Sequence, residues 1–169
     1  GLAGSSAGAG TALWLGFHDD MAEAESDDPV SRQSTRIQAI AVQETQSTYD
    51  IMRWSEDVFP NGLFTMEKIR ETALGNRLMV FYVVDDVNQL ESDMLVEYRK
   101  EVDMLSMIDS DDPPVYILNK KDFKPEKGNI VGNLLHSPYH AVALKKKIEQ
   151  TGIAHEIYIP AEGSKPNSS

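Results

Sequence analysis

Three short apolar runs, separated by segments of helical character, constrain the fold of this chain more than any other feature. The runs are residues 78–84 (LMVFYVV), 115–118 (VYIL) and 156–159 (EIYI). They are rich in β-branched or aromatic residues, which is typical of buried strands in parallel sheets. Residues 90–108 and 141–150, which lie between the runs, favour helices. This order predicts a three-layer α/β domain with a mostly parallel sheet and helices on both faces.

The N-terminal part of the chain adds further candidate elements. Residues 36–42 alternate roughly between apolar and polar, which favours a strand, and residues 48–54 are the expected antiparallel neighbour. Residues 63–73 have the pattern of a helix. The acidic and polar residues 19–36 predict an exposed loop.

Length and composition exclude several classes of function. The chain has 169 residues, which suits one domain; we place it at residues 1–163, with a flexible tail at residues 164–169. The formal net charge of -11 disfavours binding to nucleic acid. The absence of cysteine excludes disulfides and thiolate chemistry. No apolar run approaches the roughly 20 residues of a membrane-spanning helix, so we expect no direct membrane insertion and a cytoplasmic or nuclear location.

The four residues after the run 115–118 carry the sharpest short signal. They read Asn-Lys-Lys-Asp at positions 119–122. The carboxyl end of a parallel strand is where α/β sheets bind ligands. One carboxylate can accept both adjacent N–H donors of guanine, so Asp122 suits guanine recognition, while Asn119 binds the base edge or ties neighbouring loops together. The aliphatic stem of Lys120 can cover the ring. An ordinary polar turn after a strand is the alternative interpretation.

A glycine-rich stretch near the N-terminus has the length of a phosphate-binding loop. Residues 4–11 read GSSAGAGT, against the pattern G-x-x-x-x-G-K-[ST]. Ala9 and Gly10 stand at the second Gly and Lys positions, so the loop lacks the Lys that meets the β- and γ-phosphates. The remaining phosphate contacts are predicted from Gly4, Gly8, Gly10 and Thr11.

With these motifs, the chain resembles the Ras family of small GTPases over nearly its full length. Residues 98–122 look like the family's third helix, following loop, fifth strand and guanine motif. Thr35 stands near the family's magnesium-coordinating Thr, and Ala161 stands in the loop where the family has Ser-Ala-Lys. The resemblance implies a Ras-like fold, with about six strands in its mostly parallel sheet, and a base contact from the Ala161 amide. It also implies metal ligands at Thr11 and Thr35 if Mg²⁺ binds.

The departures from the family pattern imply lost catalysis. In residues 49–57, Arg53 replaces the metal-binding Asp, Glu56 the Gly and Asp57 the catalytic Gln. The resemblance therefore implies a pseudoGTPase that serves as a protein-interaction or regulatory module in signalling, with absent or weak guanine-nucleotide binding and little or no GTP hydrolysis. We assign no catalytic residue. The expected cofactor is none, or weakly bound GTP or GDP with Mg²⁺, and the expected partner is a protein.

Two other functions stay open. One is a slow GTP-binding switch with non-standard motifs. The other follows if residues 13–17 form a strand, which gives a flavodoxin-like domain; residues 54–62 are mildly similar to TIR-like domains. Such a domain binds nucleotide or cleaves NAD through a Glu on a helix, and Glu97 or Glu101 is the candidate here.

An acidic stretch and the histidines complete the candidate sites. The carboxylates gathered in residues 19–28 are either a solvated loop or a docking surface for the partner. His136 and His140 have the i, i+4 spacing of metal ligands, but Pro138 lies between them, and we interpret all four histidines as surface or loop residues. No Ser, His and acid trio is recognisable, so hydrolase chemistry is not expected.

Overall fold

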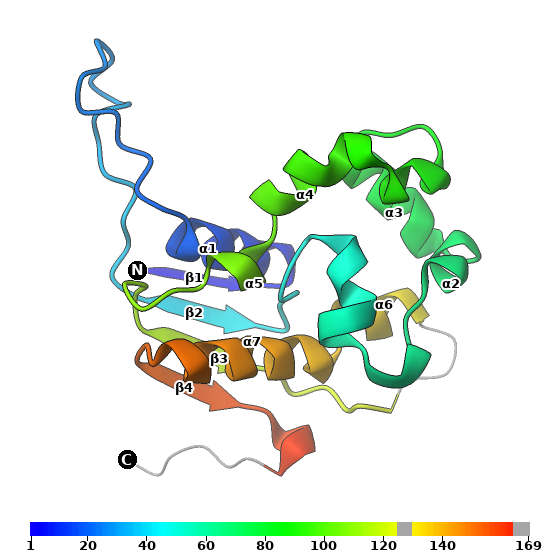
Figure 1. Ribbon diagram of the computed structural model, residues 1–169. Coiled ribbons are helices and arrows are strands. Elements are labelled where there is room, and N and C mark those ends of the chain that lie inside the picture. Colours follow the sequence, from blue (N-terminus) through cyan, green and yellow to red (C-terminus); the bar gives the residue numbers. More distant parts are fainter. Residues whose placement is uncertain (125–129, 164–169) are drawn as a thin grey trace.

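Four parallel strands form the sheet of this protein. The computed structural model describes residues 1–124 and 130–163, so the expected tail at residues 164–169 lies outside the described residues. The strands pair in sequence order (Figure 1): β1 (Leu2–Ser5), β2 (Ile40–Gln43), β3 (Val115–Leu118) and β4 (His155–Tyr158). The α/β class and the parallel sheet are confirmed, but the described residues form four strands, not six.

Two helices cover one face of the sheet. Helix α1 (Ala7–Phe17) follows β1 directly, and α7 (Pro138–Thr151) connects β3 to β4 on the same side (Figure 1). Ser137 caps α7, Pro138 takes its first position and Gly152 ends it in the left-handed conformation, all of which favour a helix with these bounds. The core between the sheet and these helices includes Leu13, Ile40, Val42, Ile117, Leu144 and Ile148.

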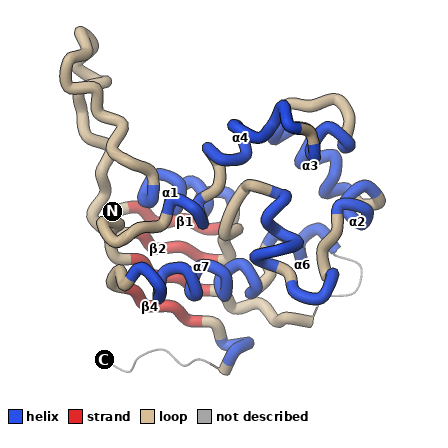
Figure 2. The backbone as a smooth tube through the Cα atoms, in the orientation of Figure 1, coloured by secondary structure: helices blue, strands red, loops and turns tan. Residues whose placement is uncertain are grey.

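A helical cap, residues 51–101, lies toward the carboxyl ends of the strands (Figure 2). Its longer helices are α2 (Met66–Arg70), α3 (Ala73–Tyr82) and α4 (Val96–Glu101). Short turns of helix complete it: η1 (Ile51–Arg53), η2 (Trp54–Val58), η3 (Pro60–Gly62), η4 (Val87–Glu91) and η5 (Asp93–Leu95). Outside the cap lie α5 (Met104–Met107), α6 (Ile130–Leu135) and η6 (Pro160–Glu162). No helix in the described ranges is long and apolar enough to cross a membrane.

The run 78–84 is not a strand, and its placement in α3 corrects the prediction. Leu74, Leu78 and Tyr82 are buried at a spacing of four residues, which is the period of a helix. Val80 and Val83 are 81% and 88% exposed, although both are β-branched and apolar. In the sequence, the apolar residues of the buried face and these exposed valines together form one continuous apolar run, which is the pattern of a buried strand.

Other predicted elements differ from the structure. Residues 90–108 break into several short helices. Residues 48–54 form a short loop that leads into η1 and the start of η2, in place of an antiparallel strand. The helix expected at residues 63–73 is interrupted, because Thr72 caps a new helix through its contact with the Leu74 amide. Residues 36–42 do end in β2, but that strand pairs in parallel on both sides.

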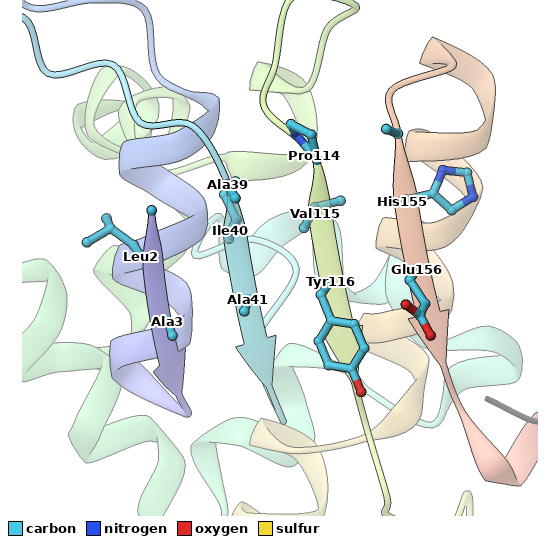
Figure 3. A pocket seen from close by; sticks show the side chains of 12 residues that line it. Leu2, Ala3, Ala39, Ile40, Ala41, Pro114, Val115, Tyr116, His155 and Glu156 are labelled. Atoms are coloured by element: carbon cyan, nitrogen blue, oxygen red, sulfur yellow. The ribbon is translucent and has the colours of Figure 1, made fainter. Parts of the chain in front are cut away.

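The other face of the sheet is exposed along one row of residues. Ala3, Ala41, Tyr116 and Glu156 lie side by side in the register, and all but the half-buried Ala41 are exposed. A shallow hollow of about 620 Å³ runs over the N-terminal halves of the strands here (Figure 3). Ligands of α/β sheets bind at the carboxyl ends of the strands, so the functional site is expected there and not at this hollow.

Candidate active site

Ser6 occupies a strained turn between β1 and α1. Its φ of 53° and ψ of −122° are unusual for a residue with a side chain and cost about 1–3 kcal/mol. The turn is held on both sides, because the Ser6 amide donates to the Gln43 carbonyl at 3.1 Å. The Ser6 carbonyl accepts from the amides of Ala9 and Gly10 at 3.0 and 3.1 Å.

The residues around Ser6 allow this turn to be sharp. A Cβ atom on Gly4 would lie 2.3 Å from the carbonyl oxygen of Gly8, so only glycine fits there. The sequence Gly4-Ser5-Ser6-Ala7-Gly8 thus has the pattern G-x-S-x-G, with the central serine between a strand and a helix. This pattern and position are similar to those of the nucleophile elbow of α/β hydrolases, which projects a serine hydroxyl from the end of the sheet.

His136 meets the hydroxyl of Ser6. Ser6 Oγ lies 2.8 Å from His136 Nε2, although the two residues are 130 positions apart in the sequence. His136 lies just beyond α6, and its amide donates to the Gly132 carbonyl at 3.0 Å. A serine hydroxyl at hydrogen-bond distance from an imidazole is the geometry of an activated nucleophile and its base.

Asn119 binds the backbone of His136. The side-chain amide of Asn119 donates to the His136 carbonyl at 3.1 Å, and its Oδ1 accepts from the Lys121 amide at 2.9 Å. Asn119 is 1% exposed at the end of β3. The side chain thus ties two loops together, which was one of the two roles expected for it.

His136 also lines a polar cleft. It has a volume of about 330 Å³ and is lined by His136 together with Asp122, Lys120 and Lys121. Asp122 is exposed and, within the described ranges, forms no ion pair with His136. Lys121 lies 3.7 Å from a carboxylate oxygen of Glu44. The structure therefore places a carboxylate in the same cleft as the imidazole without a direct contact.

An apolar cavity of about 410 Å³ opens beside Ser6. The sheet end contributes Ser6 and Ala7, and the cap contributes mainly apolar side chains: Ile51, Trp54, Leu74, Leu78 and Phe81. The amides of Ala7 and Gly8 have no acceptor within α1, because the first amides of any helix have none. The site therefore combines a serine hydroxyl, an imidazole, N–H donors at the start of a helix and an apolar cavity.

His140 is a structural histidine. It is fully buried; its Nδ1 accepts from the Ser47 amide at 3.2 Å, and its Nε2 lies 3.0 Å from the Leu134 carbonyl. The ring packs edge-on against Trp54, with centroids 4.7 Å apart. Burial lowers its pKa to about 3, so the ring is neutral at ordinary pH. The interpretation as a surface or loop residue is thus wrong for His140, whereas His136 does lie in a loop, where it is half-buried.

The residues predicted to bind phosphate and metal have other surroundings. Gly4 ends in β1, while Gly8, Gly10 and Thr11 belong to α1. A Cβ on Gly10 would lie 2.0 Å from the Tyr49 hydroxyl oxygen. The Thr11 hydroxyl donates to the Ala7 carbonyl at 3.1 Å, and the Thr35 amide donates to Asp20 Oδ1 at 2.9 Å in the exposed loop. The described residues contain no cluster of three His, Asp or Glu able to hold a metal.

Other predicted residues also lie apart from Ser6. Ala161 lies in η6 after β4. Arg53 forms ion pairs with Asp57 in the cap and with Asp103 just beyond it. Glu101, a candidate for NAD cleavage, accepts from His18 at 3.2 Å and is exposed. Of the predicted site residues, the structure brings only Asn119 close to the turn that follows Gly4, through its bond to His136.

Comparison with known proteins gives one structural neighbour to report. No protein-family model matches the chain, and no curated protein matches it. Among solved structures, it is similar to the crystal structure of an acetyl ester-xyloside bifunctional hydrolase from Caldicellulosiruptor lactoaceticus, with a TM-score of 0.59 and 18% sequence identity. The match covers 93% of this chain but 44% of that one, so the chain spans less than half of the neighbour. At this identity the likeness establishes the fold alone.

The expected kinship with Ras-family GTPases is wrong. The structural neighbour is a hydrolase, and β1 lies at the edge of the described sheet, whereas the first strand of a Ras-like fold lies in the middle. The pseudoGTPase module, the slow GTP switch and the TIR-like domain are overturned with it. Glycine-rich strand–turn–helix segments serve both phosphate loops and nucleophile elbows. The serine in the centre of Gly4 to Gly8 was the signal that could have told them apart.

Proposed function

We propose that this chain carries the nucleophile and the base of a serine hydrolase that cleaves carboxylic esters. The observation that carries the proposal is the 2.8 Å contact between Ser6 Oγ and His136 Nε2 on a strained strand–helix turn. The similarity to a protein described as an acetyl ester-xyloside bifunctional hydrolase supports the choice of esters. We do not assign that protein's substrates to this chain, because the chain matches less than half of it.

The reaction follows from the positions of these groups. Ser6 Oγ attacks the carbonyl carbon of the ester while His136 Nε2 takes the hydroxyl proton. The oxygen of the tetrahedral intermediate faces the amides of Ala7 and Gly8, which have no acceptor in α1. When the C–O bond breaks, His136 returns the proton to the leaving alcohol, and a water molecule then hydrolyses the acyl-Ser6 ester by the same proton path. For His136 to accept through Nε2, the neutral ring carries its proton on Nδ1.

The adjacent serine provides a matched control for a test of this proposal. Ser5 and Ser6 are neighbours in the sequence, but Ser5 ends β1 and is exposed, whereas Ser6 forms the turn. The intact chain is treated with a fluorophosphonate, and hydrolysis of 4-nitrophenyl acetate is measured in parallel. We expect one covalent adduct, on Ser6. Ser6→Ala should abolish the adduct and lower the rate of hydrolysis by at least about 10³-fold, whereas Ser5→Ala should retain both the adduct and the rate. Labelling or hydrolysis that survives Ser6→Ala, or its absence in the folded wild type, would overturn the proposal.

A second pair of variants tests the base. His136→Gln removes the acceptor of the Ser6 proton, whereas His155→Gln changes an exposed histidine on β4. We expect His136→Gln to slow adduct formation on Ser6 by about 10³-fold or more and His155→Gln to leave it unchanged. Equal rates in the two variants would show that His136 is not the base.

A further inference from the structure

One arginine on the cap faces the same cavity as the nucleophile. Arg77 lies on α3 and lines the cavity of about 410 Å³ that contains Ser6. It is the one charged residue among the described residues that line this cavity, whose other walls are mostly apolar. Arg77 itself is exposed, and its α3 neighbours Leu74, Leu78 and Phe81 line the cavity with it. The cavity therefore has a nucleophile from the sheet end, an apolar body and a cation from the cap.

Arg77 also differs from every other arginine of the chain. The remaining five are each held by a hydrogen bond or an ion pair; they are Arg32, Arg36, Arg53, Arg70 and Arg99. In the described part of the chain, the Arg77 guanidinium has no such partner, although the net charge of -11 makes carboxylates abundant. A guanidinium that no carboxylate of an acidic protein neutralises remains available to a ligand.

We infer that the substrate is an ester that carries a free carboxylate at the end of an apolar segment, and that Arg77 binds this carboxylate while Ser6 attacks the ester carbonyl. Guanidinium groups bind carboxylates through two parallel hydrogen bonds, which adds geometric specificity to the attraction. The apolar walls between the two residues suit a methylene chain, and the cavity volume falls in the range of small-molecule sites. Monoesters of aliphatic dicarboxylic acids have this combination of groups. This inference rests on the proposed ester hydrolysis.

The test compares two substrates that differ only in the distal charge. Hydrolysis of the 4-nitrophenyl monoester of adipic acid is measured against its neutral analogue, in which the free carboxylate is methylated. We expect the wild-type chain to prefer the charged substrate by about tenfold in kcat/KM, and Arg77→Gln to reduce this ratio to about one. Arg32→Gln removes the same charge from the exposed loop and should leave the ratio unchanged. A wild-type ratio near one, or a ratio that survives Arg77→Gln, overturns the inference.

A binding measurement separates this inference from the proposed reaction. Calorimetry with Ser6→Ala compares monomethyl adipate with dimethyl adipate, and neither is turned over by this variant. If the wild type hydrolyses no ester but Ser6→Ala prefers monomethyl adipate and loses the preference with Arg77→Gln, the carboxylate site stands and the proposed function fails. If Ser6-dependent hydrolysis occurs with no preference in either assay, the function stands and the role of Arg77 fails.

Discussion

The side-chain amide of Asn119 donates a hydrogen bond to the carbonyl oxygen of His136 at 3.1 Å. Asn119 directly follows β3 and is 1% exposed, so it belongs to the rigid part of the sheet. His136, in contrast, lies in the connection between two helices. This bond therefore ties the backbone of His136 to the end of β3.

Replacement of Asn119 should affect turnover through the position of His136. We expect Asn119→Ala to lower kcat for ester hydrolysis by about 10–100-fold with little change in KM, because a displaced base no longer lines up with Ser6. The unpaired His136 carbonyl should also cost about 1–3 kcal/mol of unfolding free energy. Steady-state kinetics and urea denaturation measure the two effects. A proportional rise in KM with constant kcat would show that Asn119 shapes the binding cavity and does not position the base.

The two outer glycines of the turn should differ sharply in their tolerance of a methyl group. A Cβ on Gly4 would lie 2.3 Å from the Gly8 carbonyl oxygen, whereas a Cβ on Gly8 meets no atom within 4 Å. We expect Gly4→Ala to destabilise the chain by about 2 kcal/mol or more and to abolish fluorophosphonate labelling. Gly8→Ala lies in α1 and should stabilise it by up to about 1 kcal/mol. Thermal unfolding of both variants decides; similar melting temperatures would mean that the turn can open at Gly4.

Local signals predicted the parts of this fold that depend on neighbouring residues. Helix α7 was recognisable because its C-terminal Gly152 ends an apolar periodicity, and β3 because Pro114 precedes a short apolar run. Helix α3 was not, because the exposed Val80 and Val83 hide the helical period of its buried side. A single sequence records apolar character but not whether a side chain is exposed, so this run was predicted to be a strand.

The pairing of residues in the candidate site could not be predicted from local signals, for a different reason. The Ser6–His136 contact joins residues 130 positions apart, and only the tertiary fold brings β1 and the end of α6 together. Asn119 was singled out because it follows a strand at the ligand-binding edge of the sheet, and either a base contact or a tie between loops was expected for it. Its side-chain amide donates to the His136 carbonyl, which is a tie between loops.

Stability should fall with acid through His140. Its folded pKa of about 3 lies below the ordinary value of 6.5, so below pH 6.5 the unfolded chain binds a proton that the folded chain refuses. The stabilisation is full above pH 6.5 and is lost toward pH 3, by up to about 1.4 kcal/mol per pH unit. Asp112 has the opposite effect on stability. Burial raises the pKa of its carboxyl to about 6, so the folded chain takes up this proton first and gains stability as the pH falls below 6. We therefore compare urea unfolding of the wild type with His140→Gln at pH 7.5, 6 and 4.5. The wild type should lose more stability than the variant over this range; equal losses would contradict a buried neutral ring.

The ion pairs of Arg53 should be unequal in strength. Its guanidinium pairs with Asp103, whose side chain is 8% exposed, and with Asp57, whose side chain is 42% exposed. Asp103 also accepts from Thr48 at 2.7 Å and from Ser106 at 2.6 Å, so its charge is held in place by three donors from different segments. Loss of the guanidinium would leave this carboxylate nearly buried with two neutral donors.

We expect Arg53→Met to lower the free energy of unfolding by about 2–3 kcal/mol, because an uncompensated buried charge is costly. Asp57→Asn removes only the exposed partner and should cost less than about 1 kcal/mol. Urea denaturation at pH 7 measures both, and the difference should shrink when Asp103→Asn is introduced alongside Arg53→Met, since a neutral amide no longer needs the cation. If the two single variants lose equal stability, the pairs contribute alike and the buried position of Asp103 confers no special dependence on Arg53.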